Sequence, residues 1–322
     1  MNGSTLKTWL GSVMLVAVVA ACGGGTSPTA TPTSPADTSP PSPSVEPSEA
    51  AATPSAASSA QPSAGKLTLK AYFLLFGNTD GPTPLVPVSR EVDGTVAVAR
   101  AAMEQLLAGP TDDERAHDLR VGTIGTRIPD GTRLLSLDVA EGVATVDLSG
   151  EFASGDITGD ERESWAIRLA QVTYTLTQFP TVQSVRFLVD GGPGNAIEGH
   201  EGSPIDLATR AAYADQLPAV FVDDPAWGGA LTDPLTVSGI AQVGGESPEF
   251  QAALVSRTTD ETLIQQAVRP TCPTGCWQPP GGGGFDFQMA VPGGAEQDDL
   301  MLVVWAGPAN GDQSNAVSYP LR

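Results

Sequence analysis

The 322-residue sequence has few of the side chains that metal centres and hydrolytic triads need. It contains three cysteines and two histidines. A zinc site usually takes four ligands, most often Cys and His, and a Ser-His-Asp triad needs a histidine beside its nucleophile. His117 and His200 are far along the chain from the cysteine pair Cys272 and Cys276. We therefore expect no metal, no cofactor and no catalytic residues.

Positive charge is also scarce. Sixteen Lys and Arg accompany 37 Asp and Glu, which gives a formal net charge of -21. Binding to nucleic acid or to bare anionic lipid depends on clusters of Lys and Arg that release counterions, and the sequence shows no such cluster. We therefore expect no nucleic-acid partner, and we interpret the acidity as a source of solubility and of repulsion between molecules.

The first apolar run, GSVMLVAVVA at residues 11–20, is too short to span a bilayer comfortably. Lys7 precedes it and small residues follow it, which predicts a secretory signal peptide over residues 1–21. The next four-residue pattern, Val19-Ala20-Ala21-Cys22, resembles a bacterial lipobox, in which diacylglycerol is attached to the cysteine before cleavage. This resemblance implies a lipoprotein with fatty acid such as palmitate on Cys22, held at the extracytoplasmic face of the cell membrane. An ordinary signal peptide with an incidental cysteine is the alternative.

The lipid anchor can be tested at Cys22. Replacing this residue with Ala removes the thiol that would carry the lipid, so the Cys22→Ala protein should leave the membrane fraction and become soluble. Fractionation of cells with and without detergent measures this release. A variant that still required detergent for extraction would show that the lipid hypothesis is wrong.

Residues 22–65 differ in composition from the rest of the chain. They are rich in Ser, Thr, Pro and Ala, and from Gly23 onward they contain no aromatic residue. Such a segment cannot bury enough apolar surface to offset the entropy of ordering it. We expect a disordered tether with a typical reach of about 35–40 Å.

Residues 66–217 alternate between strand and helix patterns. The first predicted helix places Val96, Ala99, Met103, Leu106 and Leu107 on one face, with Asp93 or Thr95 near its N-cap and Gly109 at its end. The second predicted helix places Trp165, Leu169, Val172, Leu176 and Phe179 on one face. Strands are expected at 66–76, 85–92, 133–139, 143–149 and 182–191, with a tight turn at Ala140-Glu141-Gly142. We expect an α/β sandwich in which both helices cover one face of a sheet.

Several stretches of this region resemble the GerMN domain, which is named for sporulation and germination proteins. They are LLAGP, TRIPDGTRLLSL, GVATVDLS and LAQVTYTLTQFPTVQSVRFLVDG, and the similarity spans about residues 69–192. The resemblance implies a fold similar to ring-building modules, an assembly role at the cell envelope and no catalytic residues.

Residues 218–322 show seven short strand patterns and no helix. The strands are expected at 219–225, 235–243, 249–257, 261–269, 284–292, 300–307 and 316–322. Alternation places Phe285, Phe287, Met289 and Val291 on one face, as in a β-sandwich. The stretches DPLTVSGIA, FQAALV, GGFDFQMAV and LMLVVWAG resemble the immunoglobulin-like domain associated with spore germination proteins. The expected fold class is therefore α+β, an α/β sandwich followed by an all-β immunoglobulin-like sandwich.

Cys272 and Cys276 are expected to form a disulfide in an exported protein. Pro273 and Gly275 make such a small loop feasible, and the adjacent Trp277 is either partly buried or a binding residue.

Two functions remain from the sequence. The first is a non-catalytic interaction module of the cell envelope, with an envelope protein, a second copy of the chain or wall glycan as its partner. The alternative is a surface lipoprotein that binds or hydrolyses cell-wall glycan or a small solute.

Overall fold

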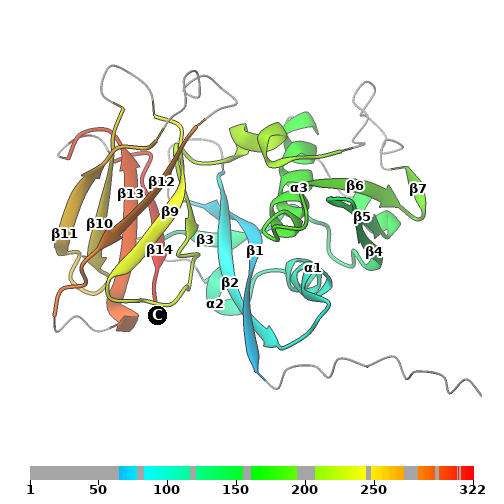
Figure 1. Ribbon diagram of the computed structural model, residues 1–322, viewed down its shortest axis with the longest axis horizontal. Helices are drawn as coiled ribbons and strands as arrows, with labels where there is room; N and C mark the ends of the chain where they lie inside the picture. The colour runs from blue at the N-terminus through cyan, green and yellow to red at the C-terminus, as the bar shows by residue number, and fades with distance from the viewer. Residues whose placement is uncertain are drawn as a thin grey trace, which may run out of the picture. The chain divides into compact units, whose positions relative to one another are not determined.

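The computed structural model describes residues 65–77, 83–116, 121–154, 161–193, 207–243, 248–271, 282–293, 297–309, 311 and 313–322 (Figure 1). These residues belong to one compact unit, Ser58–Arg322. The predicted lipidation site Cys22 and the predicted disulfide partners Cys272 and Cys276 lie outside the described residues, as does Trp277. These assignments remain predictions, as does the division between residues 66–217 and 218–322. For clarity, residues up to 217 are called the α/β part and the later residues the β part.

The first sheet of the α/β part is antiparallel and has the order β2-β1-β3. Its strands are β1 (Lys66–Phe76), β2 (Leu85–Asp93) and β3 (Thr123–Gly125). β1 pairs with β2 from Lys66 to Leu74, but with β3 only from Leu74 to Phe76. The continuous apolar stretch from Ala71 to Leu75 is at most 1% exposed, so this strand is buried on both faces.

The second sheet has the order β4-β5-β6-β7. It contains β4 (Leu134–Ala140), β5 (Val143–Leu148), β6 (Ser184–Val189) and the short β7 (Gly192–Pro193). The predicted turn between β4 and β5 is present, with positive φ at Glu141 (52°) and Gly142 (81°). Two successive positive φ angles are typical of the hairpin turn that matches strand twist. β5 and β6 are parallel, as expected for strands joined by a helical crossover.

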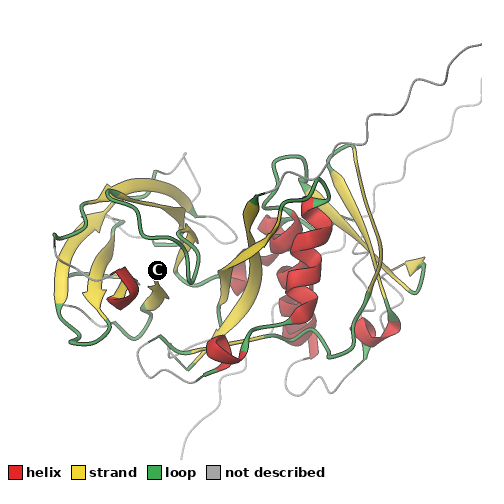
Figure 2. Cartoon of the chain, turned by 90° about the horizontal axis from the view of Figure 1, so that it is seen from below, coloured by secondary structure: helices red, strands yellow, loops and turns green. Residues whose placement is uncertain are grey.

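The two long helices lie between these sheets (Figures 1 and 2). α1 (Val98–Ala108) contacts β1 and β4, and α3 (Glu161–Leu176) contacts β1, β2 and β6. The expectation of one sheet with both helices on a single face is therefore wrong. Short helical turns complete this part: α2 (Asp112–Arg115), η1 (Gly150–Ala153) and η3 (Arg210–Gln216). No helix in the described ranges is long and apolar enough to cross a membrane.

The polar side of α3 explains this arrangement. Gln171, Thr173 and Thr175 are 0% exposed although they are polar. The Tyr72 N–H donates to Thr175 Oγ1 at 3.1 Å, and Gln171 Nε2 donates to the Tyr72 carbonyl at 3.0 Å. Gln178 makes the same pair of bonds with the backbone of Lys70, at 2.9 and 2.7 Å. Side chains in the C-terminal half of α3 and just beyond it thus satisfy the backbone hydrogen bonds of β1 at positions that do not pair with β3.

The ends of the helices differ from the predicted ones. α1 begins at Val98, so Val96 lies before it and is 78% exposed. Neither Asp93 nor Thr95 is the N-cap, because Ala97 occupies that position and no side chain caps the helix. Gly109 ends α1 as predicted, with φ of 76°. α3 ends at Leu176, and Phe179 packs against the core just beyond it.

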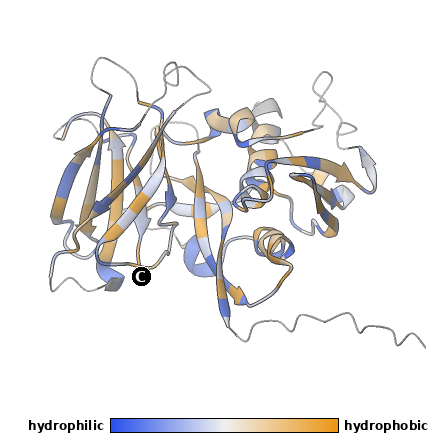
Figure 3. Cartoon of the chain, viewed as in Figure 1, coloured by the Kyte–Doolittle hydropathy of each residue, from blue (hydrophilic) through white to orange (hydrophobic). Residues whose placement is uncertain are grey.

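The β part contains all seven predicted strands in two sheets, ordered β12-β9-β8 and β11-β10-β13-β14. The strands are β8 (Val220–Asp224), β9 (Leu235–Ala241), β10 (Phe250–Ser256), β11 (Thr262–Val268), β12 (Gly283–Met289), β13 (Leu300–Ala306) and β14 (Val317–Pro320), and a short turn, η4 (Gln297–Asp299), precedes β13. Apolar and polar residues alternate along β12 (Figure 3). Phe285 and Met289 are buried, and the ring of Phe285 lies 4.7 Å from that of Phe250. These contacts confirm the predicted inward face of the strand.

The segment Pro225–Gly229, here called the junction segment, connects the two parts through backbone hydrogen bonds. The Ser89 N–H donates to the Trp227 carbonyl, and the Trp227 N–H donates to the Pro87 carbonyl, both at 2.9 Å. On its other side, the Gly228 N–H donates to the Pro320 carbonyl at 2.8 Å. The junction segment therefore fills the outer edge of β2 and contacts the end of β14.

Two glycines on neighbouring strands test the packing of the β part. A Cβ atom on Gly239 would lie 2.0 Å from the Phe221 carbonyl oxygen, whereas one on Gly284 would meet no atom within 4 Å. Gly239→Ala should therefore lower the free energy of unfolding by about 2–3 kcal/mol, and Gly284→Ala should change it by less than about 0.5 kcal/mol. Denaturant unfolding of both variants measures the difference. Equal stability of the two would contradict the close approach at Gly239.

Candidate functional site

A partly buried polar cluster lies where the α/β part meets β8. It consists of Tyr72 from β1, Arg210 from the start of η3, Asp223 from β8 and Lys70 from β1, and we call it the junction cluster. The Tyr72 hydroxyl donates to Asp223 Oδ1 at 2.5 Å, and Arg210 NH2 donates to the Tyr72 hydroxyl at 3.1 Å. Arg210 NH1 lies 3.6 Å from Asp223 Oδ1, and Lys70 Nζ lies 3.5 Å from Asp223 Oδ2. One carboxylate therefore contacts two cations and a phenol.

Strand periodicity places Asp223 in this cluster. Side chains two residues apart in a strand share a face, so Phe221 and Asp223 both point away from the sandwich interior. The ring of Phe221 lies 6.4 Å from that of Tyr72 and 6.0 Å from that of Tyr174. The guanidinium of Arg210 lies over the Tyr174 ring at 4.8 Å. Aromatic rings thus cover one side of the charged groups.

Arg210 is held from several directions. Its Nε donates to Thr177 Oγ1 at 3.0 Å, and the Tyr174 hydroxyl donates to the Arg210 carbonyl at 3.1 Å. Both partners belong to α3 or directly follow it. The guanidinium is therefore held by the α/β part and contacts Asp223 of the β part.

The electrostatics of the cluster keep it charged at neutral pH. Burial alone raises the pKa of Asp223, but Lys70, Arg210 and the Tyr72 hydroxyl outweigh it and hold the pKa below its ordinary value. Burial lowers the pKa of Arg210, and Tyr72 and Asp223 together raise it above its ordinary value. Burial also raises the pKa of Tyr72 well above 10. A carboxylate, a guanidinium and a neutral phenol are therefore the stable forms.

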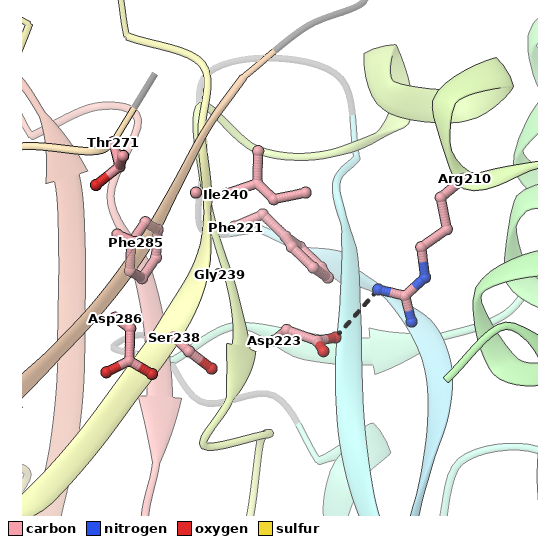
Figure 4. Close-up of a pocket in the computed structure, with 10 residues that line it drawn as sticks. Arg210, Phe221, Asp223, Ser238, Gly239, Ile240, Thr271, Phe285 and Asp286 are labelled. Carbon is pink, nitrogen blue, oxygen red and sulfur yellow. Dashed lines mark ion pairs between the residues drawn. The ribbon is translucent and has the colours of Figure 1, made fainter. Parts of the chain in front are cut away.

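A cleft opens beside the junction cluster, and we call it the junction cleft (Figure 4). Its volume is about 630 Å³. Most of its lining comes from the face of the β12-β9-β8 sheet that points away from the sandwich interior, and Arg210 lines it from the α/β part. Its lining includes Arg210, Phe221, Asp223, Ser238, Ile240, Thr271, Gly284 and Asp286.

Tyr72 and Asp223 are the two groups of this site whose pKa values bear on acid–base chemistry. A general acid or base works best when its pKa lies near the operating pH, and Tyr72 and Asp223 are shifted away from neutrality in opposite directions. The described residues also contain no group of three or more His, Cys, Asp or Glu that could hold a metal ion.

The sequence alone did not identify Tyr72, Arg210 or Asp223 as a cluster. The predicted site residues, Cys22, Cys272 and Cys276, lie outside the described residues, so the structure brings none of them to this site. The sequence offered one signal for Asp223. This residue comes directly after the apolar stretch Val220–Val222 and, two positions after Phe221, shares the strand face of that ring. A charged residue on the same strand face as a large aromatic residue indicates a contact with another part of the chain. The sequence carries no sign that Arg210 is the partner.

The junction cluster should make stability depend on pH. Asp223→Asn removes the charge between Lys70 and Arg210, so we expect the free energy of unfolding at pH 7 to fall by about 2–3 kcal/mol. Because the folded-state pKa of Asp223 lies below its ordinary value of 3.8, the stabilisation is present above that pH and is lost as the pH falls further. The wild type and the variant should therefore converge in strong acid, as urea unfolding at several pH values can show.

Asp224→Asn is the matched control. Asp224 is adjacent in sequence and also lies near Lys70, at 3.6 Å, but its side chain is 61% exposed. Its replacement should cost less than about 1 kcal/mol. Equal costs for the two variants would show that the junction cluster does not stabilise the fold.

Comparisons with known proteins agree with the GerMN resemblance of the α/β part. Residues 70–195 match the Germane family model, described as sporulation and spore germination. No curated protein matches the chain.

Three solved structures are similar to parts of the chain. The first GerMN domain of the sporulation protein GerM from Bacillus subtilis is 23% identical with a TM-score of 0.34, covering 45% of this chain and 98% of that one. The tandem GerMN domains of the same protein are 22% identical with a TM-score of 0.34, covering 58% of each chain. A candidate lipoprotein from Clostridium perfringens is 21% identical with a TM-score of 0.29, covering 47% and 92%. Residues 70–195 are thus similar to the Germane domain, which is described by the words sporulation and spore germination.

Proposed function

We propose that this chain is a non-catalytic interaction module of the bacterial cell envelope, held at the membrane by lipid on Cys22. The observation that carries the proposal is the Germane match over residues 70–195, which links the α/β part to sporulation and germination proteins. The lipobox pattern at Cys22 and the Ser/Thr/Pro/Ala-rich tether support an anchored protein whose folded part extends away from the membrane.

We infer further that the β part is an immunoglobulin-like sandwich. In such domains seven strands form two antiparallel sheets, one of which contains the first, second and fifth strands. Here the sheet β8-β9-β12 joins the first, second and fifth strands of the β part. The fourth strand, β11, pairs with the third, β10, in place of the fifth. This strand order supports the assignment of the β part to the wider immunoglobulin-like class, as a variant whose fourth strand lies in the other sheet.

The junction segment and the junction cluster supply what an assembly module needs. Backbone bonds join β2 to Trp227, and the charged cluster joins β1 to β8. The surface of one part to which a partner binds would therefore be held in position by the contacts of that part with the other part. Such preorganisation reduces the entropy lost on binding.

A second candidate function, binding of a small solute, has one specific observation in its favour, the junction cleft. Hydrolysis of glycan is less well supported. Glycosidases use two carboxyl groups, one of which is a protonated acid with a raised pKa, whereas the pKa of Asp223 is held below its ordinary value.

Photocrosslinking in intact cells tests the assembly function. Leu135 and Val139 on β4 are large apolar side chains that are 45% and 40% exposed, so a photoreactive residue at either position reports on contacts of the Germane domain. We expect crosslinks to a second copy or to one recurrent envelope protein, identified by mass spectrometry. A photoreactive residue at the exposed Glu261 of the β part is the control and should give fewer crosslinks.

Two outcomes would count against the proposed assembly role. One is recovery of wall fragments or small solutes without any recurrent protein. The other is an equal yield and pattern of crosslinks from Leu135 and Glu261, because contacts made by chance do not distinguish the Germane domain from the rest of the surface.

A further inference from the structure

The junction cleft exists because small residues occupy one face of the β12-β9-β8 sheet. Asp286 of β12 lies directly opposite Ser238 of β9, and Gly284 lies opposite Ile240. A Cβ atom on Gly284 would meet nothing within 4 Å, so the space above this glycine is open. The cleft volume of about 630 Å³ falls within the range of about 300–1,000 Å³ typical of small-ligand sites.

The charges around the cleft are not equally available to a ligand. Arg210 and Asp223 already interact with each other, and Asp223 also accepts from Tyr72 and lies near Lys70. Asp286 differs, because it is exposed and its carboxylate makes no hydrogen bond or ion pair with any other residue in the described part of the chain. Its carboxylate is the acceptor that remains for a ligand, and the hydroxyls of Ser238 and Thr271 line the cleft with it (Figure 4).

The apolar part of the lining suits an aliphatic chain better than a sugar ring. Proteins bind sugars well where an aromatic face is open, but Phe221 is 1% exposed and packs against two tyrosine rings. Phe285 is 7% exposed and packs against Phe250. Ile240 is only partly buried and presents a branched aliphatic side chain to the cleft. Methylene groups can lie against this surface while a charged end remains hydrated.

The net charge of the whole chain favours the same ligand. A formal charge of -21 raises the local concentration of cations and lowers that of anions at the surface. A ligand with a positive group is therefore attracted over a longer range than the contacts in the cleft can reach.

We propose that the junction cleft binds a primary ammonium group on an aliphatic stem, as in the lysine-type side chain of a short peptide. The ammonium group pairs with Asp286 and donates to the hydroxyl of Ser238, which lies opposite it on β9. The methylene stem lies over Gly284 against Ile240. This inference rests on the cleft alone and stands or falls independently of the assembly role of the Germane domain.

Calorimetry on the full-length protein in detergent tests this proposal with three probes. The first is acetyl-Ala-Lys-Ala-amide, the second is the same peptide with an Nε-acetylated lysine, and the third is a chitin tetrasaccharide. We expect binding of the first peptide that weakens as salt is added, because charge attraction is screened. The acetylated peptide keeps the stem but loses the charge, so it should bind at least about fivefold more weakly.

Substitutions locate the binding in the cleft. Asp286→Asn keeps the size of the side chain and should weaken the lysine peptide about five- to tenfold, whereas Glu261→Gln, at another exposed acid of the β part, should not change its affinity. Gly284→Trp should fill the cleft and abolish binding, and Gln288→Trp, on the same face but outside the cleft lining, should not. Thermal unfolding checks that each variant is folded. If Gly284→Trp does not fold, the affinity of Asp286→Asn alone tests whether the peptide binds in the cleft.

Several results would overturn the proposal. They are no binding of the lysine peptide at millimolar concentration, equal binding of its acetylated form, or an affinity unchanged by Asp286→Asn. Preference for the chitin tetrasaccharide would assign the cleft to glycan instead.

Discussion

A buried strand must satisfy the hydrogen bonds of both its edges, and in this protein a helix satisfies part of one edge of β1. β3 covers only the last residues of that edge, and Gln171, Thr175 and Gln178 bond to the backbone of Tyr72 and Lys70. This requirement fixes α3 against the first sheet. Because α3 also contacts β6, the second sheet must then lie on the other side of the helices.

The position of the β part follows from the same strand. Tyr72, whose backbone is held by α3, directs its hydroxyl to Asp223, and Arg210 reaches the same carboxylate from beside α3. The junction segment adds backbone bonds to β2. Removing one member of such a cluster lowers stability by more than the whole cluster contributes, because a partly buried charge is left without its partner. The junction cleft lies along the part of the β12-β9-β8 face that the cluster leaves uncovered.

Much of the fold could be predicted from residue patterns, because alternation and helical periodicity report directly on burial. They identified the strands of the β part, the turn at Glu141-Gly142 and the buried face of α3. They did not reveal that α3 is buried on a polar side as well, since Thr173 and Gln171 resemble solvent-facing residues until their neighbours are known. The junction cluster was missed for a related reason. Tyr72 and Asp223 are separated by 151 residues, and no local pattern encodes a contact between side chains so far apart.

The pairing of β1 with β2 has a mechanical consequence. The two strands are antiparallel and paired from Lys66↔Asp93 to Leu74↔Leu85, and β2 is in turn bonded to the junction segment. If a protein anchored through its N-terminal segment is pulled by a partner bound to its β part, the force enters at Lys66 and runs along β1. Force along a strand loads its cross-strand hydrogen bonds together, as in shear, whereas force across it would break them one at a time. Under such a load the first sheet would carry the tension through all of its β1–β2 pairs.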